Sequence, residues 1–383
     1  MANHHADLAI VGAGILGLAH AYAAAKSGKR VVVFERAQRA AGASVRNFGM
    51  IWPIGQPAGE MLTLALRSRA IWREVLLEAK LPSRETGSLH LTYRQDEAEV
   101  AQEFAEMASG LGYDCQWIAP HAVLQRSQAV QPDGLLGALW SPTELTVDPR
   151  RIVAELPAFL TERFGVEFRF ATAVRAIVPP VLETADTESN ERWTADQFLI
   201  CSGEDFETLY PAHYAASGLT RCKLQMLRTA SQPSGWELGP SLAAGLTLRF
   251  YPAFEVCKTL DALKARIAEE TPELDRWGIH ALVSQTWDGA LTLGDSHEYG
   301  LAVDIFNKAK IDDLILDYTR GFLRAPEMRI AERWYGVYAK HPTKTLVTME
   351  PEASVRIVAS PGGSGMTLSM GLGEKMISEM ERA

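Results

Sequence analysis

The chain has 383 residues, of which 47% are hydrophobic and 22% charged, and its formal net charge is −9. This length predicts two domains, and the acidic balance, which no basic tract interrupts, excludes nucleic acid as a partner. We find no run long and apolar enough to cross a bilayer. The widely spaced cysteines lack metal-ligand spacing, which predicts reduced thiols in a cytoplasmic protein without a metal site. They are Cys115, Cys201, Cys222 and Cys257.

The first predicted elements are a strand, a glycine turn and a helix. They follow a short flexible leader with His4 and His5, to which we assign no role. The apolar run 7–11 predicts a buried strand, and the alanine-rich segment 16–27 predicts a helix. Between them, Gly12 permits a tight turn, Gly14 lets the backbone approach a pyrophosphate, and Gly17 lets the helix pack on the strand.

A second buried strand over 30–34 ends in Glu35, which follows Gly17 by 18 residues. This spacing is close to that expected for an acidic residue that binds ribose hydroxyls. Because a carboxylate at this place repels a 2′-phosphate, NADP is disfavoured. The glycine turn therefore has the strand, helix and acidic residue that a dinucleotide site requires.

The middle of the chain alternates between helical and β-rich segments. Helices are expected over 60–79, 96–111, 148–164 and 312–322. Strands are expected over 88–93, 166–170, 173–177 and 198–203, with β-rich segments over 223–251 and 280–293. In this interpretation Arg249 lies on a strand over 246–251 whose side chains alternate in direction. Its side chain faces either the interior of the protein or solvent.

A second glycine-rich segment, Gly362 to Thr367, lies near the end of the chain between a strand over 355–360 and a helix over 366–380. A segment that returns from the far end indicates a long cofactor held by backbone at both ends, which favours FAD over NAD. The predicted fold class is α/β, with a Rossmann-like FAD-binding domain containing a parallel sheet and a second α+β domain with a largely antiparallel sheet. The FAD-binding domain is expected over 1–80, 146–222 and 335–383, and the substrate-binding domain over 81–145 and 223–334.

These glycine segments, with Glu35 and the run Gly42-Ala-Ser44-Val-Arg46-Asn47-Phe-Gly49, carry a family resemblance. Over nearly its full length the chain resembles the FAD-dependent amine and amino-acid oxidoreductases typified by D-amino-acid oxidase, glycine oxidase and sarcosine oxidase. More narrowly, the segments 47–56, 294–299 and 333–342 resemble a subgroup usually associated with phosphonate breakdown.

The resemblance implies a set of cofactor-binding residues. They are Gly12, Gly14, Ile15, Leu16, Gly17, Glu35 and Arg36 in the first unit; Ser44, Arg46, Asn47 and Gly49 beside the pyrophosphate and flavin ring; Val174 at the adenine; Ser202 and Gly203 near the ribityl chain; Gly336; and Gly362, Gly363, Ser364, Gly365, Met366 and Thr367. The last five, from Gly363 to Thr367, would aim N–H groups at the flavin O2 and N1 edge, where a helix N-terminus stabilises negative charge. Ser44 and Asn47 also suit a plain turn.

The resemblance also implies the chemistry. A flavin takes a hydride from a carbon that bears an amine nitrogen, and the imine that forms hydrolyses. Oxygen or another acceptor then reoxidises the flavin. Family members with covalent flavin carry a cysteine in the segment corresponding to 338–345, and this chain has none there, so we expect noncovalent FAD.

One departure from the family bears on the substrate. Where the amino-acid oxidases have a Gly-x-Arg clamp for a carboxylate, this chain reads Gly336-Val-Tyr338. Tyrosine cannot replace the guanidinium fork, so an ordinary α-amino acid is in doubt unless Arg249, Lys340 or Arg228 takes over. The expected substrate is a small amine, either neutral or anionic, and the anionic candidate is an aminoalkylphosphonate or its N-methyl derivative.

The candidate substrate-binding residues are Trp52, Gln56, Arg249, Tyr251 and Lys340, and the candidate catalytic residues are Tyr338, His341 and His297. Trp52 and Gln56 form either a flap over the flavin or plain packing. Lys340 and His341 precede Pro342 in a turn-like segment, and a surface position is the alternative for both. His297 suits a satisfied loop histidine as well as a base.

Two other functions stay open. An FAD-dependent dehydrogenase of hydroxy acids or polyol phosphates would share the fold, but it needs a base for the hydroxyl proton, for which only His297 and His341 are candidates. A flavoprotein without enzymatic activity would show a degraded pocket, and nothing in Trp52, Tyr251 or Tyr338 indicates one.

Overall fold

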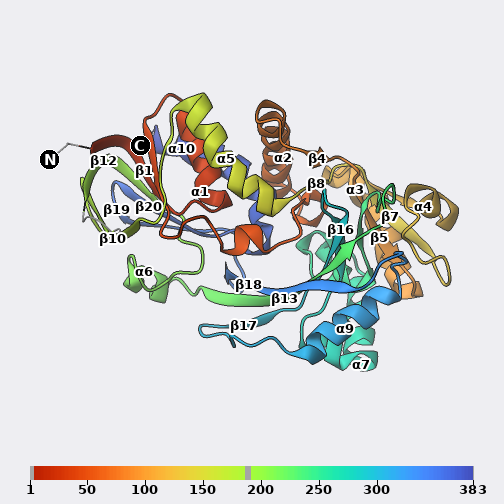
Figure 1. Ribbon diagram of the computed structural model, residues 1–383. Coiled ribbons are helices and arrows are strands. Elements are labelled where there is room, and N and C mark those ends of the chain that lie inside the picture. Colours follow the sequence, from red (N-terminus) through yellow and green to blue (C-terminus); the bar gives the residue numbers. More distant parts are fainter. Residues whose placement is uncertain (1–3, 186–190, 383) are drawn as a thin grey trace.

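The computed structural model describes residues 4–185 and 191–382, and its two large sheets lie side by side (Figure 1). Residues 1–3, 186–190 and 383, which the predicted domain ranges include, lie outside the described part of the chain. Across that part, no helix has both the length and the apolar character needed to span a membrane.

The first sheet is built on parallel strands in the order β20, β12, β1, β2, β9, and β10, β11 and β19 extend it in antiparallel fashion. Its strands are β1 (His4–Val11), β2 (Val31–Phe34), β9 (Glu167–Arg169), β10 (Ala173–Val178), β11 (Val181–Ala185), β12 (Arg192–Ile200), β19 (Val347–Glu352) and β20 (Val355–Ser360). All four residues of β2 are buried, as expected for a parallel strand covered on both faces.

Helices cover one face of this sheet. They are α1 (Ile15–Lys26), α2 (Glu60–Glu78), α5 (Pro149–Phe164) and α10 (Gly365–Met380). Leu18 of α1 and Met370 of α10 pack with Ile10 of β1 in one core. On the other face, a second core joins β1, β2 and β12 to β10, β11 and α6 (Pro211–Ala216). Segments from both ends of the chain therefore pack on the same sheet.

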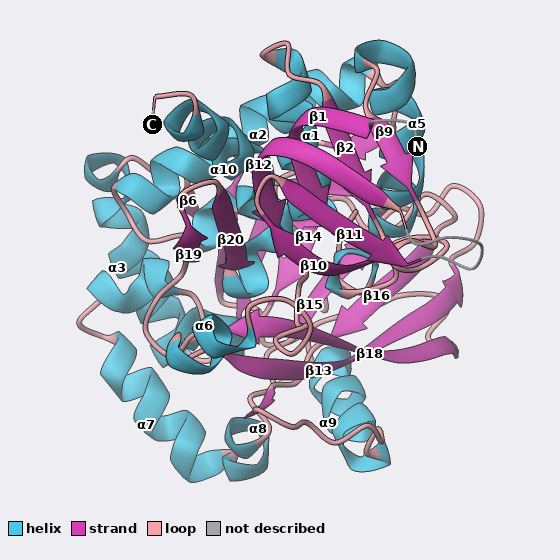
Figure 2. Cartoon of the chain, turned by 90° about the vertical axis from the view of Figure 1, so that its left-hand side faces the viewer, coloured by secondary structure: helices cyan, strands magenta, loops and turns pink. Residues whose placement is uncertain are grey.

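The second sheet is almost wholly antiparallel, with β14 and β5 as its described parallel pair. Its strands are β5 (Ser88–Thr92), β6 (Gln116–Ile118), β7 (Gly137–Ser141), β13 (Thr220–Ser231), β14 (Ser241–Ala243), β15 (Leu282–Gln285), β16 (Ala290–Gly294), β17 (Glu298–Gly300) and β18 (Ile330–Lys340). The long pair β13 and β18 runs beneath the first sheet in Figure 2. The expected α/β class, with one parallel and one antiparallel sheet, is confirmed.

The remaining elements lie around the second sheet or between the two. The helices are α3 (Gln95–Leu111), α4 (Pro120–Arg126), α7 (Leu260–Glu270), α8 (Pro272–Arg276) and α9 (Ala309–Arg320), and the small sheet is β3 (Met50–Ile51), β8 (Leu145–Val147) and β4 (Ser83–Arg84). Five short 3₁₀ turns are η1 (Ala43–Val45), η2 (Pro53–Gly55), η3 (Gly245–Arg249), η4 (Pro252–Val256) and η5 (Gly362–Ser364). The expected domain boundary at residue 335 falls inside β18, which pairs with β13 from residue 330 to residue 340.

Two local expectations were wrong. Arg249 ends the 3₁₀ turn η3 rather than lying on a strand, because residues 245–248 are buried in succession and Pro252 cannot donate to a sheet ladder. His4 and His5 do not belong to a flexible leader, since both pair with β12 as the first residues of β1. The ring of His4 also stacks on Trp193 with their centroids 4.4 Å apart.

Candidate active site

A single cavity of about 780 Å³ connects the glycine turns of the first sheet with the second sheet. Most of the candidate residues line it. They are Gly12, Gly14, Ile15, Leu16, Glu35, Arg36, Ser44, Arg46, Asn47, Trp52, Gln56, Val174, Ser202, Gly203, Tyr251, His297, Gly336, Tyr338, Lys340, Gly362, Gly363, Ser364, Gly365, Met366 and Thr367. Four candidates do not line it: Gly17, Gly49, Arg249 and His341.

The first end of the cavity is the turn between β1 and α1. Gly12 has φ +101°, and a Cβ there would collide with the carbonyl oxygen of Cys201. A Cβ on Gly17 would collide in turn with the carbonyl oxygen of Gly12. Helix α1 begins with Gly14 at its N-cap and no side-chain cap hydrogen bond, so the turn presents backbone to the cavity.

Glu35 lies beside this turn at the carboxyl end of β2. Its Oε2 accepts a hydrogen bond from the N–H of Ala13 at 3.0 Å, and its Oε1 accepts one from the N–H of Ala37 at 3.0 Å. Ser44 Oγ accepts from the N–H of Ile15 at 2.9 Å. The carboxylate and the hydroxyl are thereby held against the start of α1, where an anionic pyrophosphate and its ribose would lie.

The second glycine segment reaches the same cavity from the other end of the chain. Helix α10 begins at Gly365, and Ser364 at its N-cap makes no side-chain cap hydrogen bond. Thr367 Oγ1 accepts from the backbone N–H of Trp52 at 2.9 Å, and Gln56 Nε2 donates to Ser364 Oγ at 3.0 Å. Two helix N-termini therefore border one cavity, and the Glu35 carboxylate in the same cavity is placed to bind a ribose. This arrangement fits FAD.

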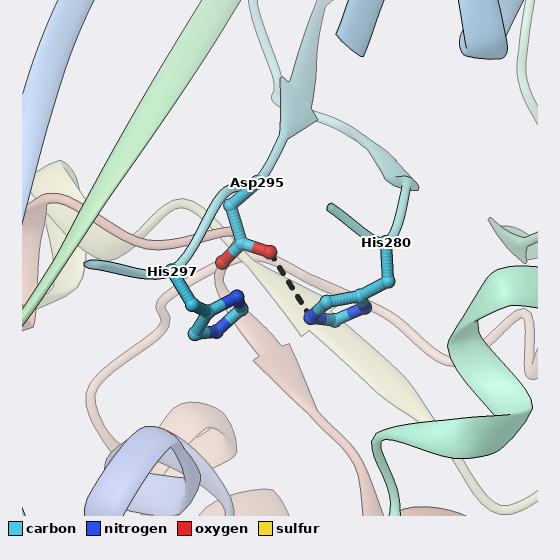
Figure 3. Close-up of side chains that lie close together, drawn as sticks. All are labelled: His280, Asp295 and His297. Atoms are coloured by element: carbon cyan, nitrogen blue, oxygen red, sulfur yellow. Dashed lines mark ion pairs between the residues drawn. The ribbon is translucent and has the colours of Figure 1, made fainter. Parts of the chain in front are cut away.

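The far end of the cavity contains a cluster of His280, Asp295 and His297 (Figure 3). His280 Nε2 lies 3.1 Å from Asp295 Oδ1, and His297 Nδ1 lies 2.9 Å from the carbonyl oxygen of Gly278. The ring of Phe250 stacks on both imidazoles, with centroid distances of 4.3 Å to His280 and 5.2 Å to His297. Of the three clustered residues, sequence reasoning singled out His297 alone.

Burial and mutual charge set the ionisation of this cluster. Burial lowers the pKa of the His297 imidazole, although the Asp295 carboxylate opposes this effect. Burial would raise the pKa of Asp295, but His297 and His280 outweigh it and lower that pKa. The cavity wall therefore carries an ionised carboxylate next to an imidazole that is neutral at neutral pH.

Tyr338 and Lys340 enter the cavity from β18. Burial raises the pKa of Tyr338 well above its ordinary value, so this phenol stays protonated and can donate a hydrogen bond. Among the residues that the structure describes, the Lys340 ammonium forms no ion pair within 4.0 Å. Its charge acts on His297, whose pKa it helps to lower.

The structure places two of the candidate residues, Arg249 and His341, outside the cavity lining. Arg249 turns away from the cavity because its Nε pairs with Asp275 at 3.4 Å and its NH1 donates to the carbonyl of Leu246 at 2.9 Å. His341 lies in the turn after β18, where its Nδ1 accepts from the N–H of Lys344 at 3.0 Å. Arg228, the other cation considered, pairs with Asp288 and Glu332 at 2.5 and 3.1 Å.

The parallel sheet, its glycine turns and the cavity reaching an antiparallel sheet are those of the flavin-dependent oxidoreductases. The chain belongs to the DAO family, described as FAD dependent oxidoreductase, whose family model matches residues 7–379. Glycine oxidase of Geobacillus kaustophilus (strain HTA426) is 27% identical over 162 residues, which are 40% of this chain and 43% of that protein. The match thus spans less than half the length of this curated relative.

Solved structures share the fold along nearly the whole chain. The crystal structure of glycine oxidase from Geobacillus kaustophilus aligns with a TM-score of 0.76 at 20% identity, over 99% of this chain and 95% of that one. The FAD-bound, dithionite-reduced L-α-glycerophosphate oxidase from Mycoplasma pneumoniae aligns with a TM-score of 0.74 at 15% identity, over 98% and 95%. At these identities the likeness concerns the fold.

Proposed function

We propose that this protein oxidises the C–N bond of a small amine that carries an anionic group, with an aminoalkylphosphonate or its N-methyl derivative as the substrate class. The observation that carries this proposal is that one cavity joins both glycine turns to the Lys340 ammonium. The phosphonate-associated segments noted in the sequence supply Trp52, Gln56, Asp295, His297, Tyr338 and Lys340 to its lining.

The cofactor in this proposal is noncovalent FAD. The turns at Gly12 and Gly14 would hold its pyrophosphate, Glu35 its ribose, and the start of α10 its flavin edge. When bound, FAD supplies the acceptor for a hydride from the carbon next to the amine nitrogen. Residues 338–345 contain no cysteine that could attach the flavin, which supports noncovalent binding.

The chain's own residues would bind and orient the substrate. Trp52 and Tyr251, whose ring centroids lie 6.3 Å apart, form an aromatic wall that excludes water from the reacting carbon. Lys340 would neutralise part of the charge of the anionic group, and the Tyr338 hydroxyl would donate a hydrogen bond to it. The imine product hydrolyses after release to an aldehyde or keto acid.

This function is tested with purified protein under anaerobic conditions. Candidate substrates are N-methyl and primary aminoalkylphosphonates, glycine, sarcosine and a set of hydroxy acids and polyol phosphates. We expect the flavin absorbance to bleach with the anionic amines. Bleaching only with the hydroxy compounds would reject the amine proposal, and retention of colour with every compound would reject both oxidase and dehydrogenase functions.

A dehydrogenase of hydroxy acids or polyol phosphates is the second candidate. It is favoured by the position of His297 on the cavity wall, because alcohol oxidation requires a base for the hydroxyl proton. The fold shared with L-α-glycerophosphate oxidase is compatible with it. Phosphate esters and phosphonates both need a cation such as Lys340, so only the substrate panel separates the two reactions.

The remaining assignments concern the setting of the reaction. We propose oxygen or another small electron acceptor as the second substrate. The four cysteines are free thiols, which supports the proposed cytoplasmic location.

A further inference from the structure

We propose that Asp295 binds the protonated nitrogen of the substrate, that His297 Nε2 removes one proton from it, and that His280 positions the Asp295 carboxylate. This proposal rests on the proposed amine oxidation and assigns the residues that recognise the amine. It also fixes the orientation of the substrate, with nitrogen at the cluster in Figure 3 and the anionic group at Lys340.

The backbone holds the three side chains in place. His280 precedes β15, and Asp295 and His297 follow β16, the antiparallel neighbour of β15. The N–H of Asp295 donates to the carbonyl of His280 at 2.9 Å, and the N–H of His280 donates back to the carbonyl of Asp295 at 3.3 Å. The N–H of His297 donates to the carbonyl of Trp277 at 2.8 Å. The cluster is therefore held in place at the open end of the hairpin formed by β15 and β16.

One oxygen of the Asp295 carboxylate has no well-aligned hydrogen-bond donor among the described residues. The side chain is almost fully buried, at 5% exposure, and its Oδ1 makes no hydrogen bond of good geometry among the described residues. His280 is the ion-pair partner that the structure gives it, and neither an arginine nor a lysine in the described chain comes within 4.0 Å. A buried carboxylate facing a cavity with no such cation is suited to a cationic ligand.

The tautomer of His297 makes it a proton acceptor. Its Nδ1 lies 2.9 Å from the carbonyl oxygen of Gly278, which can only accept, so Nδ1 must carry the hydrogen. The lone pair of the neutral ring is therefore on Nε2. Burial disfavours protonation of this ring in the unliganded protein, so at neutral pH the ring is neutral and its Nε2 lone pair is unprotonated.

The transfer balances as follows. An N–H bond of the substrate ammonium breaks, an Nε2–H bond forms on His297, and the electron pair stays on the nitrogen. That pair then forms the C=N bond as the hydride leaves the neighbouring carbon for the acceptor of the proposed function. His297 afterwards returns its proton to solvent, and Asp295 stabilises the charged imidazolium in between.

Ring geometry favours this role over a metal site. The imidazoles of His280 and His297 are stacked, with centroids 5.1 Å apart and planes inclined by 20°. Nitrogen lone pairs lie in the ring planes, so nearly parallel, stacked rings do not aim them at one point. Hydrogen bonding to a substrate nitrogen places no such demand on the two rings.

Other titratable groups also face the cluster from neighbouring elements. They are Cys222 on β13, Tyr251 beside η4, Tyr299 on β17, and Tyr338 and Lys340 on β18. Burial raises the pKa of Cys222 to about 12 and shifts the pKa of each of the three tyrosines upward. The thiol and the phenols therefore stay protonated at neutral and moderately alkaline pH, where the test is made.

The test uses the full-length FAD-loaded protein and N-methyl-2-aminoethylphosphonate, with ethylphosphonate as a nitrogen-free probe. For Asp295→Asn we expect the Kd of the amine, measured by equilibrium binding to the dithionite-reduced protein that cannot oxidise it, to rise roughly 10- to 100-fold, as for loss of a charge-assisted hydrogen bond. The Kd of ethylphosphonate should change less than about twofold, since this probe has no nitrogen to lose. Equal changes for both probes, or none for either, would overturn the assignment of Asp295.

The second variant is His297→Gln. At neutral pH the anaerobic rate of flavin reduction should fall roughly 10²- to 10⁴-fold. The rate should recover as the pH approaches the pKa of the free amine, because the substrate then arrives neutral. A pH profile parallel to that of the wild type would overturn the role of His297. The variant also decides the proposal if Asp295→Asn fails to retain FAD.

Three further outcomes are distinguishable from these. His280→Gln should raise the Kd of the amine less than Asp295→Asn does, because it leaves the charge of the Asp295 carboxylate in place. Loss of activity on dialysis against EDTA, restored by Zn²⁺, would overturn the proposal in favour of a metal site. If the wild type binds the amine but is reduced only by hydroxy acids, the proposed function fails, while the comparison of probe affinities still tests Asp295.

Discussion

The two ends of the cavity are built in different ways. At the proposed cofactor end, the cavity is lined by backbone and by residues close together in the sequence, such as Gly12, Gly14 and Glu35. At the proposed substrate end, it is lined by side chains on or next to separate strands, such as His280 and Lys340. We therefore expect few substitutions to be tolerated at the glycines of the cofactor end. At the substrate end, single side-chain substitutions can change the specificity while the fold persists.

The largest effect is expected for Gly12→Ala at the cofactor end. The new methyl group would collide with the carbonyl of Cys201 at a backbone position with φ +101°. We expect the purified variant to retain less than about a tenth of the wild-type FAD, because strain and overlap add. Flavin absorbance per chain measures this.

Gly28→Ala is the matched control. Gly28 has a similar φ of +91°, but a Cβ there would meet nothing within 4 Å. Gly28→Ala should destabilise the fold only through backbone strain, by about 1 to 2 kcal/mol, and the FAD content should be unchanged. Equal FAD loss in both variants would show that backbone strain, and not overlap with the carbonyl of Cys201, explains the effect at Gly12.

A smaller effect is expected for His90→Met behind the substrate end. Burial lowers the pKa of His90 to about 3, and neither ring nitrogen has a hydrogen-bond partner among the described residues. The unfolded chain takes up a proton as the pH falls through about 6.5, while the folded imidazole stays neutral, so the free energy of unfolding decreases. The decrease in the free energy of unfolding caused by His90 reaches about 2 kcal/mol at pH 5.

Urea unfolding at pH 8 and pH 5 measures this prediction. The loss of stability between the two pH values should be smaller in His90→Met by that amount. The control is His121→Met, which lies on the exposed side of α4. The same reduction in both variants would contradict the assignment of the acid sensitivity to the buried ring.

Lys340→Met tests the anionic side of the substrate end. The KM of an anionic amine should rise roughly 10- to 30-fold, as for loss of one charge-assisted contact, while that of the corresponding uncharged alkylamine should stay the same. Lys344→Met, at an exposed position outside the cavity, is the control and should leave both unchanged. An equal rise for both amines would mean that Lys340 supports the fold rather than the anion.

The smallest effect is expected for His341→Ala. The side chain lies outside the cavity and accepts hydrogen bonds from Thr343 and Lys344 within its own turn. The rate of flavin reduction should stay within about twofold of the wild type. A loss of several hundredfold would return His341 to the list of catalytic candidates and contradict its position in the structure.

Local motifs made the fold and the cofactor end predictable. The glycine spacing, the strand ending in Glu35 and the helix after Gly365 each depend on neighbours in sequence, and they occur where they were expected. The substrate end depends on strand register, which the sequence pattern did not specify. Leu282 pairs with Gly294, so His280 and Asp295 meet only once β15 and β16 are aligned.

A signal for these residues was present but weak. Polar residues directly before one buried strand and directly after the next are placed together whenever the two strands form a hairpin. Arg249 was misplaced for the related reason that a pattern of alternating residues does not distinguish a strand from a buried 3₁₀ turn.

The orientation of a bound amine tests the central claim most directly. We suggest a crystal structure of the dithionite-reduced, FAD-loaded protein with an aminoalkylphosphonate, since reduced flavin cannot accept a hydride and the ligand stays intact. The account predicts the flavin edge at the start of α10, the ligand nitrogen within hydrogen-bond distance of Asp295 and the phosphonate beside Lys340. A ligand with its phosphonate at Asp295, or a flavin outside this cavity, would contradict it.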